Sequence, residues 1–216
     1  ALYPNGIKQS RLCNKTMYSE LRKEKTLHYW KTHHAFPILN PGSISWEPNR
    51  LATKQLPIGL QRFYIKFLTG HIGTRHMLKH RREIANSRCL NCTKCRNEKA
   101  PHVLKCTNKK ATEHHKTKIK VDLGKELEAR KTSTTVAKII EDLLLKWKEG
   151  STIHPDNYTT DFNIRDAIKD QCKIGWTNWV IGRWSPKWQT VQKLYYKSIG
   201  SQRSSLRWTT AIIKKF

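Results

Sequence analysis

Cys89-Leu90-Asn91-Cys92 and His102-Val103-Leu104-Lys105-Cys106 stand near the middle of the chain and together read C-x2-C-x9-H-x3-C. Two thiols on a tight turn, with a His and a Cys one helical turn apart, can meet at the corners of one tetrahedron. Closed tetrahedral sets of this kind hold Zn²⁺ in structural sites. The spacing therefore predicts a structural zinc knuckle with Cys89, Cys92, His102 and Cys106 as ligands.

A fifth thiol leaves the ligand set open. Cys95 gives a second permitted pattern, C-x2-C-x6-H-x3-C, in which it replaces Cys89 while Cys92, His102 and Cys106 remain. We favour Cys89. Either set fills all four positions and leaves none open for a catalytic water, so the expected cofactor is a structural Zn²⁺. Its removal should unfold the middle of the chain.

The charge of the chain favours a polyanionic partner. The 216 residues include 42 Lys and Arg against 16 Asp and Glu, which gives a formal net charge of +26. So large an excess repels itself in the compact state and is typical of proteins that contact RNA or DNA. No apolar run approaches the ~20 residues of a membrane span, so no membrane partner is expected. The clustered thiols favour a reducing, intracellular location, nuclear or cytoplasmic.

The composition divides the chain into three parts. Residues 1–57 are basic and broken by prolines, and they read as an N-terminal connection with one helix over residues 17–30. Residues 58–120 form a helical zinc-knuckle unit, whose last stretch, 108–120, is polar and basic. Residues 121–216 form a basic, aromatic-rich helical tail. Because the sequence starts without Met and ends inside a helical pattern, we expect it to belong to a longer polypeptide.

Apolar residues at helical spacing predict a mostly α fold. The clearest stripe runs from a cap at Ser133 or Thr134 to Gly150 and comprises Val136, Ile139, Ile140, Leu143, Leu144 and Trp147. Further helices are expected over residues 60–68 and 164–172, and another is expected to begin after an N-cap at Thr74. A helix from Pro186 to Gly200 would place Trp188, Val191, Tyr195 and Ile199 on its inner face. A last helix is expected to begin near Ser204. The fold class is therefore an irregular helical fold with the small CCHC knuckle inserted between helices.

Lys and Arg alternate with these apolar residues and are the candidates for phosphate contact. Most Trp and Tyr of the tail fall at helical spacing and are assigned to the core, so the basic residues between them lie on the outer faces. The candidates near the knuckle are Arg62, Lys66, Arg75, Lys79, Arg81 and Arg82, and those in the tail are Arg183, Lys187, Lys193, Lys197, Arg203 and Arg207.

Catalytic chemistry has little support in the sequence. There is no phosphate-binding loop and no paired Asp motif of the kind that two-metal polymerases use. His154-Pro155-Asp156 resembles the start of a restriction-type nuclease motif, but no acid stands two residues before a Lys downstream of it. No small-molecule substrate is expected. A nuclease with Asp156 as a metal ligand remains one alternative, and a protein-interaction module without nucleic-acid binding is another.

The motifs resemble a known family. Phe63…Leu68-Thr69-Gly70-His71 and Arg88-Cys89…Cys92…Asn97-Glu98…His102-Val103-Leu104…Cys106 are similar to the zinc-binding unit that follows the reverse transcriptase domain in LINE-type (non-LTR) retroelements. The tail adds Gln171…Ile174-Gly175-Trp176…Gly182…Ser185-Pro186…Trp188…Gln192…Tyr195-Tyr196…Gly200-Ser201…Arg203…Trp208. The resemblance covers about residues 58–216 and departs from the family at Cys95, which sits in an apparent one-residue insertion.

The resemblance implies a function for the chain. The zinc unit and the tail would hold template RNA or target DNA during target-primed reverse transcription. The upstream reverse transcriptase domain of the same polypeptide would be a partner, and the parent protein would be an RNA-directed DNA polymerase. The polymerase motifs themselves are absent here, so this region would be non-catalytic.

Overall fold

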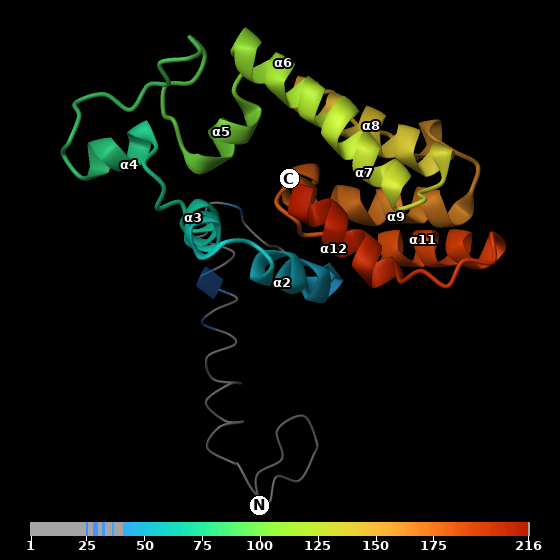
Figure 1. Ribbon diagram of the computed structural model, residues 1–216. Helices are drawn as coiled ribbons and strands as arrows, with labels where there is room; N and C mark the ends of the chain where they lie inside the picture. The colour runs from blue at the N-terminus through green and yellow to red at the C-terminus, as the bar shows by residue number, and fades with distance from the viewer. Residues whose placement is uncertain (1–24, 26–27, 30–31, 33–35, 37–40, 216) are drawn as a thin grey trace, which may run out of the picture.

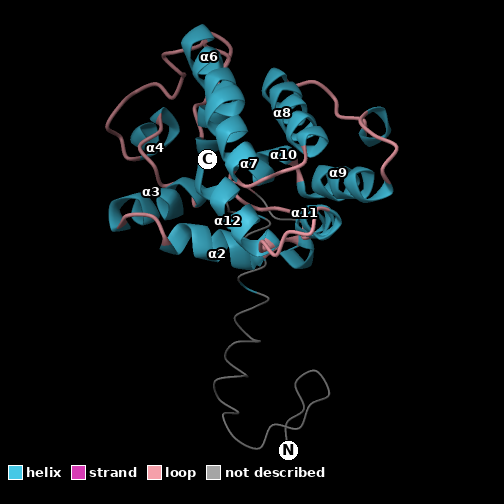
Figure 2. Cartoon of the chain, turned by 45° about the vertical axis from the view of Figure 1, so that its right-hand side comes forward, coloured by secondary structure: helices cyan, strands magenta, loops and turns pink. Residues whose placement is uncertain are grey.

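The chain is described by a computed structural model that covers residues 25, 28–29, 32, 36 and 41–215 (Figure 1). Every regular element among these residues is helical, which confirms the predicted fold class (Figure 2). The predicted helix over 17–30 lies mostly outside the described residues. The elements are η2 (Pro41–Ser43), α2 (Trp46–Lys54), α3 (Ile58–Leu68), α4 (Arg75–His80), α5 (Ala100–Lys105), α6 (Lys109–Thr117), η3 (Lys118–Leu123), α7 (Gly124–Ala129), α8 (Thr134–Glu149), η4 (Pro155–Asn157), α9 (Phe162–Ile174), α10 (Trp176–Val180), α11 (Lys187–Ser198) and α12 (Ser205–Lys215).

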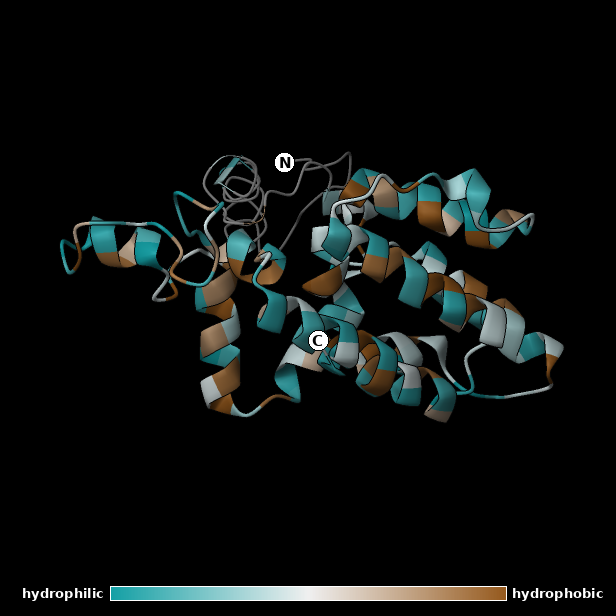
Figure 3. Cartoon of the chain, turned by 90° about the horizontal axis from the view of Figure 1, so that it is seen from above, coloured by the Kyte–Doolittle hydropathy of each residue, from teal (hydrophilic) through white to brown (hydrophobic). Residues whose placement is uncertain are grey.

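The longest helix, α8, has the bounds that its apolar stripe predicts. All six residues of the stripe are buried. Gly150 ends the helix in the left-handed conformation with φ 80°, which a residue without a Cβ adopts at little cost. Most helices show hydrophobic and hydrophilic residues on the same ribbon, as expected where one face packs inward (Figure 3).

The tail aromatics form the centre of the molecule. Trp179, Trp184, Trp188 and Trp208 are all fully buried, and the rings of Trp179 and Trp184 stack with centroids 4.1 Å apart. They join apolar residues of η3, α7, α8, α9, α11 and α12 in one continuous cluster. We call residues 109–215 the helical core. Large aromatic side chains therefore compensate for the low apolar content of the chain.

One predicted core face is wrong at a single position. Trp188 and Val191 of α11 are buried as expected, but Ile199 is half exposed. The reason is that α11 ends at Ser198, so Ile199 lies beyond the helical register. Tyr196 of α11 is buried instead, and its hydroxyl donates to the carbonyl of Arg130.

The polar stretch after the knuckle is helical, which the sequence analysis did not predict. α6, η3 and α7 follow one another without a break, and η3 is a π-helical segment. Ile119, Leu123 and Leu127 turn inward and are almost completely buried. The three residues are spaced four apart, so they share one face of the helical segment and reach the core together. The proposed division between residues 120 and 121 thus falls inside a continuous helical segment.

Part of the N-terminal segment packs against the end of the chain. α2 lies along α12. The side chain of Asn49 donates to the carbonyls of Gly182, at 3.2 Å, and Ile181, at 3.5 Å. Gly182 has φ 80°, and a Cβ there would lie 2.6 Å from Asn49 Nδ2. The close approach of α2 therefore depends on a glycine at this position.

The region that contains α4, α5 and the loop between them projects from one end of the helical core (Figure 1). We call residues 75–106 the knuckle region. A small second cluster of Phe36, Phe67, Ala100 and Ile181 lies at its base. Leu104 packs against both this cluster and the main core. No helix in the described part of the chain has the length and apolar character needed to cross a membrane.

Candidate metal centre

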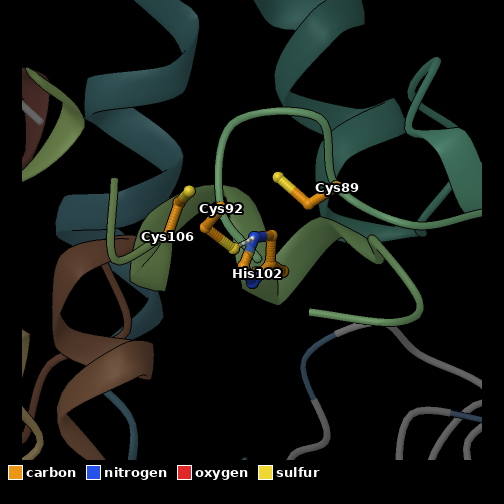
Figure 4. Close-up of side chains that lie close together, drawn as sticks. All are labelled: Cys89, Cys92, His102 and Cys106. Atoms are coloured by element: carbon orange, nitrogen blue, oxygen red, sulfur yellow. Dashed lines mark hydrogen bonds between the residues drawn. The ribbon is translucent and has the colours of Figure 1, made fainter. Parts of the chain in front are cut away.

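The loop between α4 and α5 is folded back on itself by backbone hydrogen bonds. The N–H of Glu98 donates to the carbonyl of Ser87 at 2.8 Å, and the N–H of Cys89 donates to the carbonyl of Cys95 at 3.1 Å. The tip of this loop carries Cys92. The folding of the loop brings both Cys89 and Cys92 to the start of α5, as the close-up shows (Figure 4).

The short helix α5 supplies the other two side chains. It begins at Ala100 with Pro101 in the first turn, where a missing N–H costs nothing. His102 lies in that turn, and Cys106 follows the last helical residue. A separation of four residues places their side chains one turn apart on the same side of the helix.

Cys89, Cys92, His102 and Cys106 converge on one point. The nearest ligand atoms of the four all lie within 4.8 Å of one another, and Cys92 Sγ is 3.5 Å from His102 Nε2 (Figure 4). In a tetrahedral thiolate site with metal–sulfur bonds of ~2.3 Å, neighbouring sulfurs are ~3.7 Å apart, so small side-chain movements would close the group around an ion. Cys89 and Cys106 are buried, with 4% and 6% of their surface exposed. The group could therefore hold a metal ion, and Cys95 is not a member of it.

The thiols differ in how easily they lose a proton. Burial raises the pKa of the Cys89 thiol to about 12, and hydrogen bonds with the side chains of Glu98 and Cys92 act in the same direction. Burial also acts to raise the pKa of Cys92, but backbone N–H groups of Cys95 and Lys94 and the neighbouring thiols outweigh it and lower that pKa. A metal ion binds thiolates, so loading this group would release protons.

Asn97 and Glu98, which lie between the two pairs of ligands, hold the loop against α4. The spacing of the Cys and His residues did not assign them a role. The carbonyl of Glu98 accepts from the N–H of His76 at 3.1 Å, and the Oδ1 of Asn97 lies 2.8 Å from His76 Nδ1. Thr74 caps α4 as predicted, by accepting from the N–H of Met77. The only signal for Asn97 and Glu98 was their place in the motif that carries the family resemblance.

Lys148 joins the centre to the helical core. This α8 residue is only 8% exposed, and its Nζ donates to the carbonyls of Leu104 at 2.7 Å and Cys106 at 3.2 Å. A cation at the carboxyl end of α5 satisfies carbonyls that have no helical partner and lies at the negative end of the helix dipole. Burial lowers the pKa of Lys148. Sequence reasoning missed this residue because a Lys near the end of an amphipathic helix looks like an exposed one.

A second tie reaches the turn of the first two cysteines. Asn108 caps α6 by accepting from the N–H of Ala111 at 3.2 Å. Its Nδ2 donates to the carbonyl of Asn91 at 2.7 Å. The first helix after the knuckle therefore also positions the Cys89–Cys92 turn.

The predicted phosphate contacts near the knuckle mostly lie on the surface. Arg62 and Lys66 are exposed on α3, and Lys79, Arg81 and Arg82 are exposed at the end of α4. Arg75 is only partly exposed, and its Nη2 donates to the carbonyl of Asn86 at 3.0 Å. The structure therefore places three of these candidates, 79, 81 and 82, at the end of α4 in the knuckle region and leaves two on a separate helix.

The predicted contacts in the tail are more scattered. Lys193 and Lys197 are exposed on α11, and Arg203 and Arg207 are exposed at the start of α12. Arg203 Nη1 also donates to the carbonyl of Ala129 at 3.0 Å. Lys187 forms an ion pair with Asp166 at 2.8 Å, which partly neutralises it.

Arg183 requires a correction. The residue is only 3% exposed, and its Nη1 donates to the carbonyl of Phe36 at 2.7 Å and to Asn178 Oδ1 at 3.0 Å. Burial lowers the pKa of its guanidinium to about 10, so the side chain is still protonated at neutral pH. Arg183 therefore joins the N-terminal segment to the core and offers no surface for a phosphate contact.

The alternative nuclease residue, Asp156, has cations as neighbours. Its carboxylate lies 3.0 Å from Lys169 Nζ and 3.7 Å from Arg165 Nε. Within the described residues, Cys89, Cys92, His102 and Cys106 form the group of metal-binding side chains that meets in space. Asp156 is not a member of this group.

Comparison of the chain with protein-family models, curated proteins and solved structures gave no match. The resemblance to LINE-type retroelement proteins therefore stays a prediction from the motifs. The candidate centre rests on the convergence of its four side chains.

Proposed function

We propose that the chain is a nucleic-acid-binding unit with a structural Zn²⁺ centre. On the resemblance above, it would be the non-catalytic C-terminal region of a LINE-type reverse transcriptase polypeptide, where it holds template RNA or target DNA. The zinc centre would fix the shape of the knuckle region, and the basic surface around it would contact phosphates.

The choice of zinc follows from the donor set. Three thiols and one imidazole, without a carboxylate, suit a tetrahedral Zn²⁺ rather than Mg²⁺ or Ca²⁺, which prefer oxygen ligands. Zn²⁺ bound by three thiolates would leave a net negative charge on the centre. The ammonium of Lys148, held at the Cys106 carbonyl, is placed to offset part of that charge.

The observation that carries the nucleic-acid proposal is the basic surface of the knuckle region. The exposed basic residues between 79 and 99 are Lys79, Arg81, Arg82, Arg88, Lys94, Arg96 and Lys99. Glu83 is the exposed acid of this stretch, and it lies 4.0 Å from Arg81. The six basic residues other than Arg81 have no ion-pair partner within the described part of the chain. A loop stapled by zinc would hold these cations in fixed positions, so less side-chain and loop entropy would be lost when they bind phosphates.

Fluorescence anisotropy with a labelled single-stranded RNA and a duplex DNA of equal length tests this proposal. Log affinity should fall linearly with log salt between ~50 and ~200 mM KCl, because each phosphate contact releases counterions. Replacing Arg81 and Arg82 together by Gln should reduce the magnitude of the slope by about 1.4 on RNA or 1.8 on duplex DNA.

Lys187→Gln is the matched control, because Asp166 already partly neutralises this cation. Its salt slope should stay close to that of the wild type. Absence of binding at ~150 mM salt, or tight binding that ignores salt, would contradict the proposal. The first result would favour a protein-interaction module instead.

A further inference from the structure

An apolar groove lies between α2, α3, α5 and α12, and none of the four metal-binding side chains lines it. Its volume is about 370 Å³, and its lining includes Leu56, Leu60, Phe63, Val103, Val180 and Ile213. Phe63 is 56% exposed, and Leu60 and Val103 are about half exposed. Side chains of this kind cost free energy when water covers them, and contiguous apolar patches on a surface mark interaction sites.

The edge of the groove is cationic. Lys214 and Lys215 of α12 line it, and both are exposed. The segments that form the groove come from stretches without acids, because no Asp or Glu occurs between Glu47 and Glu83, between Glu98 and Glu113, or after Asp170. Two carboxylates of the described residues lie near Lys215 at this edge: Glu126 of α7, at 3.8 Å, and Asp122 of η3, whose pKa is lowered first by Lys118 and also by Lys215. The groove therefore combines an apolar floor with a positive edge.

We propose that this groove docks an amphipathic helix of a separate, acidic protein, with apolar side chains on one face and Glu or Asp beside them. Helices bind to such grooves by inserting side chains spaced at i, i+3, i+4 and i+7. The acidic flanks would pair with Lys214 and Lys215 at the edge, which favours the correct partner and speeds association.

Charge excludes two other occupants of the groove. A second copy of the chain carries the same formal charge of +26. Residues 1–35 carry two acids, Glu20 and Glu24, against seven bases, so they too would be repelled: Lys8, Arg11, Lys15, Arg22, Lys23, Lys25 and Lys31. Nucleic acid would match the edge, but the floor offers its phosphates no free donor, because the hydroxyls of Thr53 and Tyr64 already donate to the carbonyls of Asn49 and Ile181.

Binding of two synthetic helical peptides to the full zinc-loaded chain tests this inference. One peptide has Leu at i, i+3 and i+7 with flanking Glu, and the other has Lys in place of each Glu. The Glu peptide should bind at least about tenfold more tightly than the Lys peptide. Phe63→Ser and, independently, Leu60→Ser should each weaken the Glu peptide about tenfold, because buried aromatic and aliphatic anchors dominate such interfaces.

Ile65→Ser is the matched control, because Ile65 is on the same helix and equally exposed but does not line the groove. It should leave peptide affinity unchanged, and circular dichroism should show all three variants folded. Equal binding of both peptides, or equal weakening by Ile65→Ser and Phe63→Ser, would overturn the inference. Loss of oligonucleotide binding in Phe63→Ser would also overturn the inference, because the groove would then bind nucleic acid. Loss of a dimer in Phe63→Ser would overturn it too, because the groove would then bind a second copy of the chain. Because the peptide assay contains no nucleic acid, its outcome is independent of the proposed function.

Discussion

The knuckle region and the helical core are stabilised in different ways. α4 and α5 are six residues each, and α4 buries no residue completely. Helices this short are not stable alone in water. The helical core instead buries four Trp completely and joins its helices in one apolar cluster. If the four ligands hold a metal ion as proposed, one part of this chain depends on that ion, and the other depends on apolar area removed from water.

The two regions meet at a narrow junction. Leu104 packs against the core cluster, and Lys148 of the core donates to the last carbonyls of α5. The comparison implies that loss of metal should unfold the knuckle region and spare the core, and that damage to the core should leave the ligands in place. The following predictions test that separation, from the largest expected effect to the smallest.

Cys92→Ser should abolish metal binding. Apparent binding free energies of structural Zn²⁺ are roughly 10–16 kcal/mol, so the knuckle region should lose its fold while the core remains helical. Elemental mass spectrometry should give one zinc per wild-type chain and none in the variant, and circular dichroism should show only a partial loss of helix. Cys95→Ser is the control and should keep its zinc. Loss of zinc in Cys95→Ser with retention in Cys89→Ser would reverse the ligand assignment.

Leu143→Ala tests the core alone. Leu143 is completely buried in the main cluster, so its truncation should lower the free energy of unfolding by about 2–5 kcal/mol. Denaturant unfolding measures the loss, and zinc content should stay at one per chain. Leu194→Ala, on the half-exposed face of α11, should cost less than ~0.5 kcal/mol. A fall in zinc content in Leu143→Ala would show that the two regions are not separable.

His115 should make the junction sensitive to acid. Burial, followed by the charges of Lys148 and His114, lowers its pKa from 6.5 to about 4. The ring packs edge-on against Trp147, and Lys118 and Lys215 line the same small cavity. Below pH 6.5, His115 binds a proton in the unfolded chain but not in the folded chain. Its contribution to the free energy of unfolding is therefore fully present above pH 6.5 and decreases as the pH falls towards 4.

The loss attributable to His115 should reach at most ~3 kcal/mol near pH 4. The urea midpoints of wild type and His115→Gln should be compared from neutral to acid pH. Their difference separates the effect of His115 from that of thiol protonation, which is common to both proteins. Parallel pH profiles for the two proteins would contradict a buried neutral His115.

Lys148→Met should weaken the link between the regions. Two carbonyls of α5 would lose their donor, at a cost of about 1–3 kcal/mol. Competition with a chelator should show lower zinc affinity, and unfolding should show a less stable core. Lys138→Met changes an exposed residue of the same helix and should alter neither quantity. Unchanged zinc affinity in Lys148→Met would remove the proposed coupling.

The sequence predicted those parts of the molecule that carry a period or a strict spacing. The stripe from Val136 to Trp147 gave α8, and the Cys and His spacing identified the four side chains that converge. It did not give α6, η3 and α7, because Ile119, Leu123 and Leu127 are sparse among polar and charged residues. The choice between Cys89 and Cys95 could not be made from spacing, because it depends on how the loop folds back.

Long-range contacts were the other gap. Arg183 looked like any basic residue of the tail, yet it is buried because the carbonyl of Phe36 and the side chain of Asn178 accept its hydrogen bonds. The same applies to Lys148, whose partners lie more than forty residues away. A residue's own position in a helix does not show which distant carbonyl it will meet, so a buried cation and an exposed one look alike in sequence.

Hydrogen exchange followed by mass spectrometry, with zinc and after its removal by a chelator, is the most direct test of the central claim. Amides of residues 75–106 should lose their protection when the zinc is removed, while those of α8 and α12 keep theirs. Uniform loss of protection throughout the chain, or no change in residues 75–106, would contradict a metal-dependent knuckle region on a metal-independent helical core.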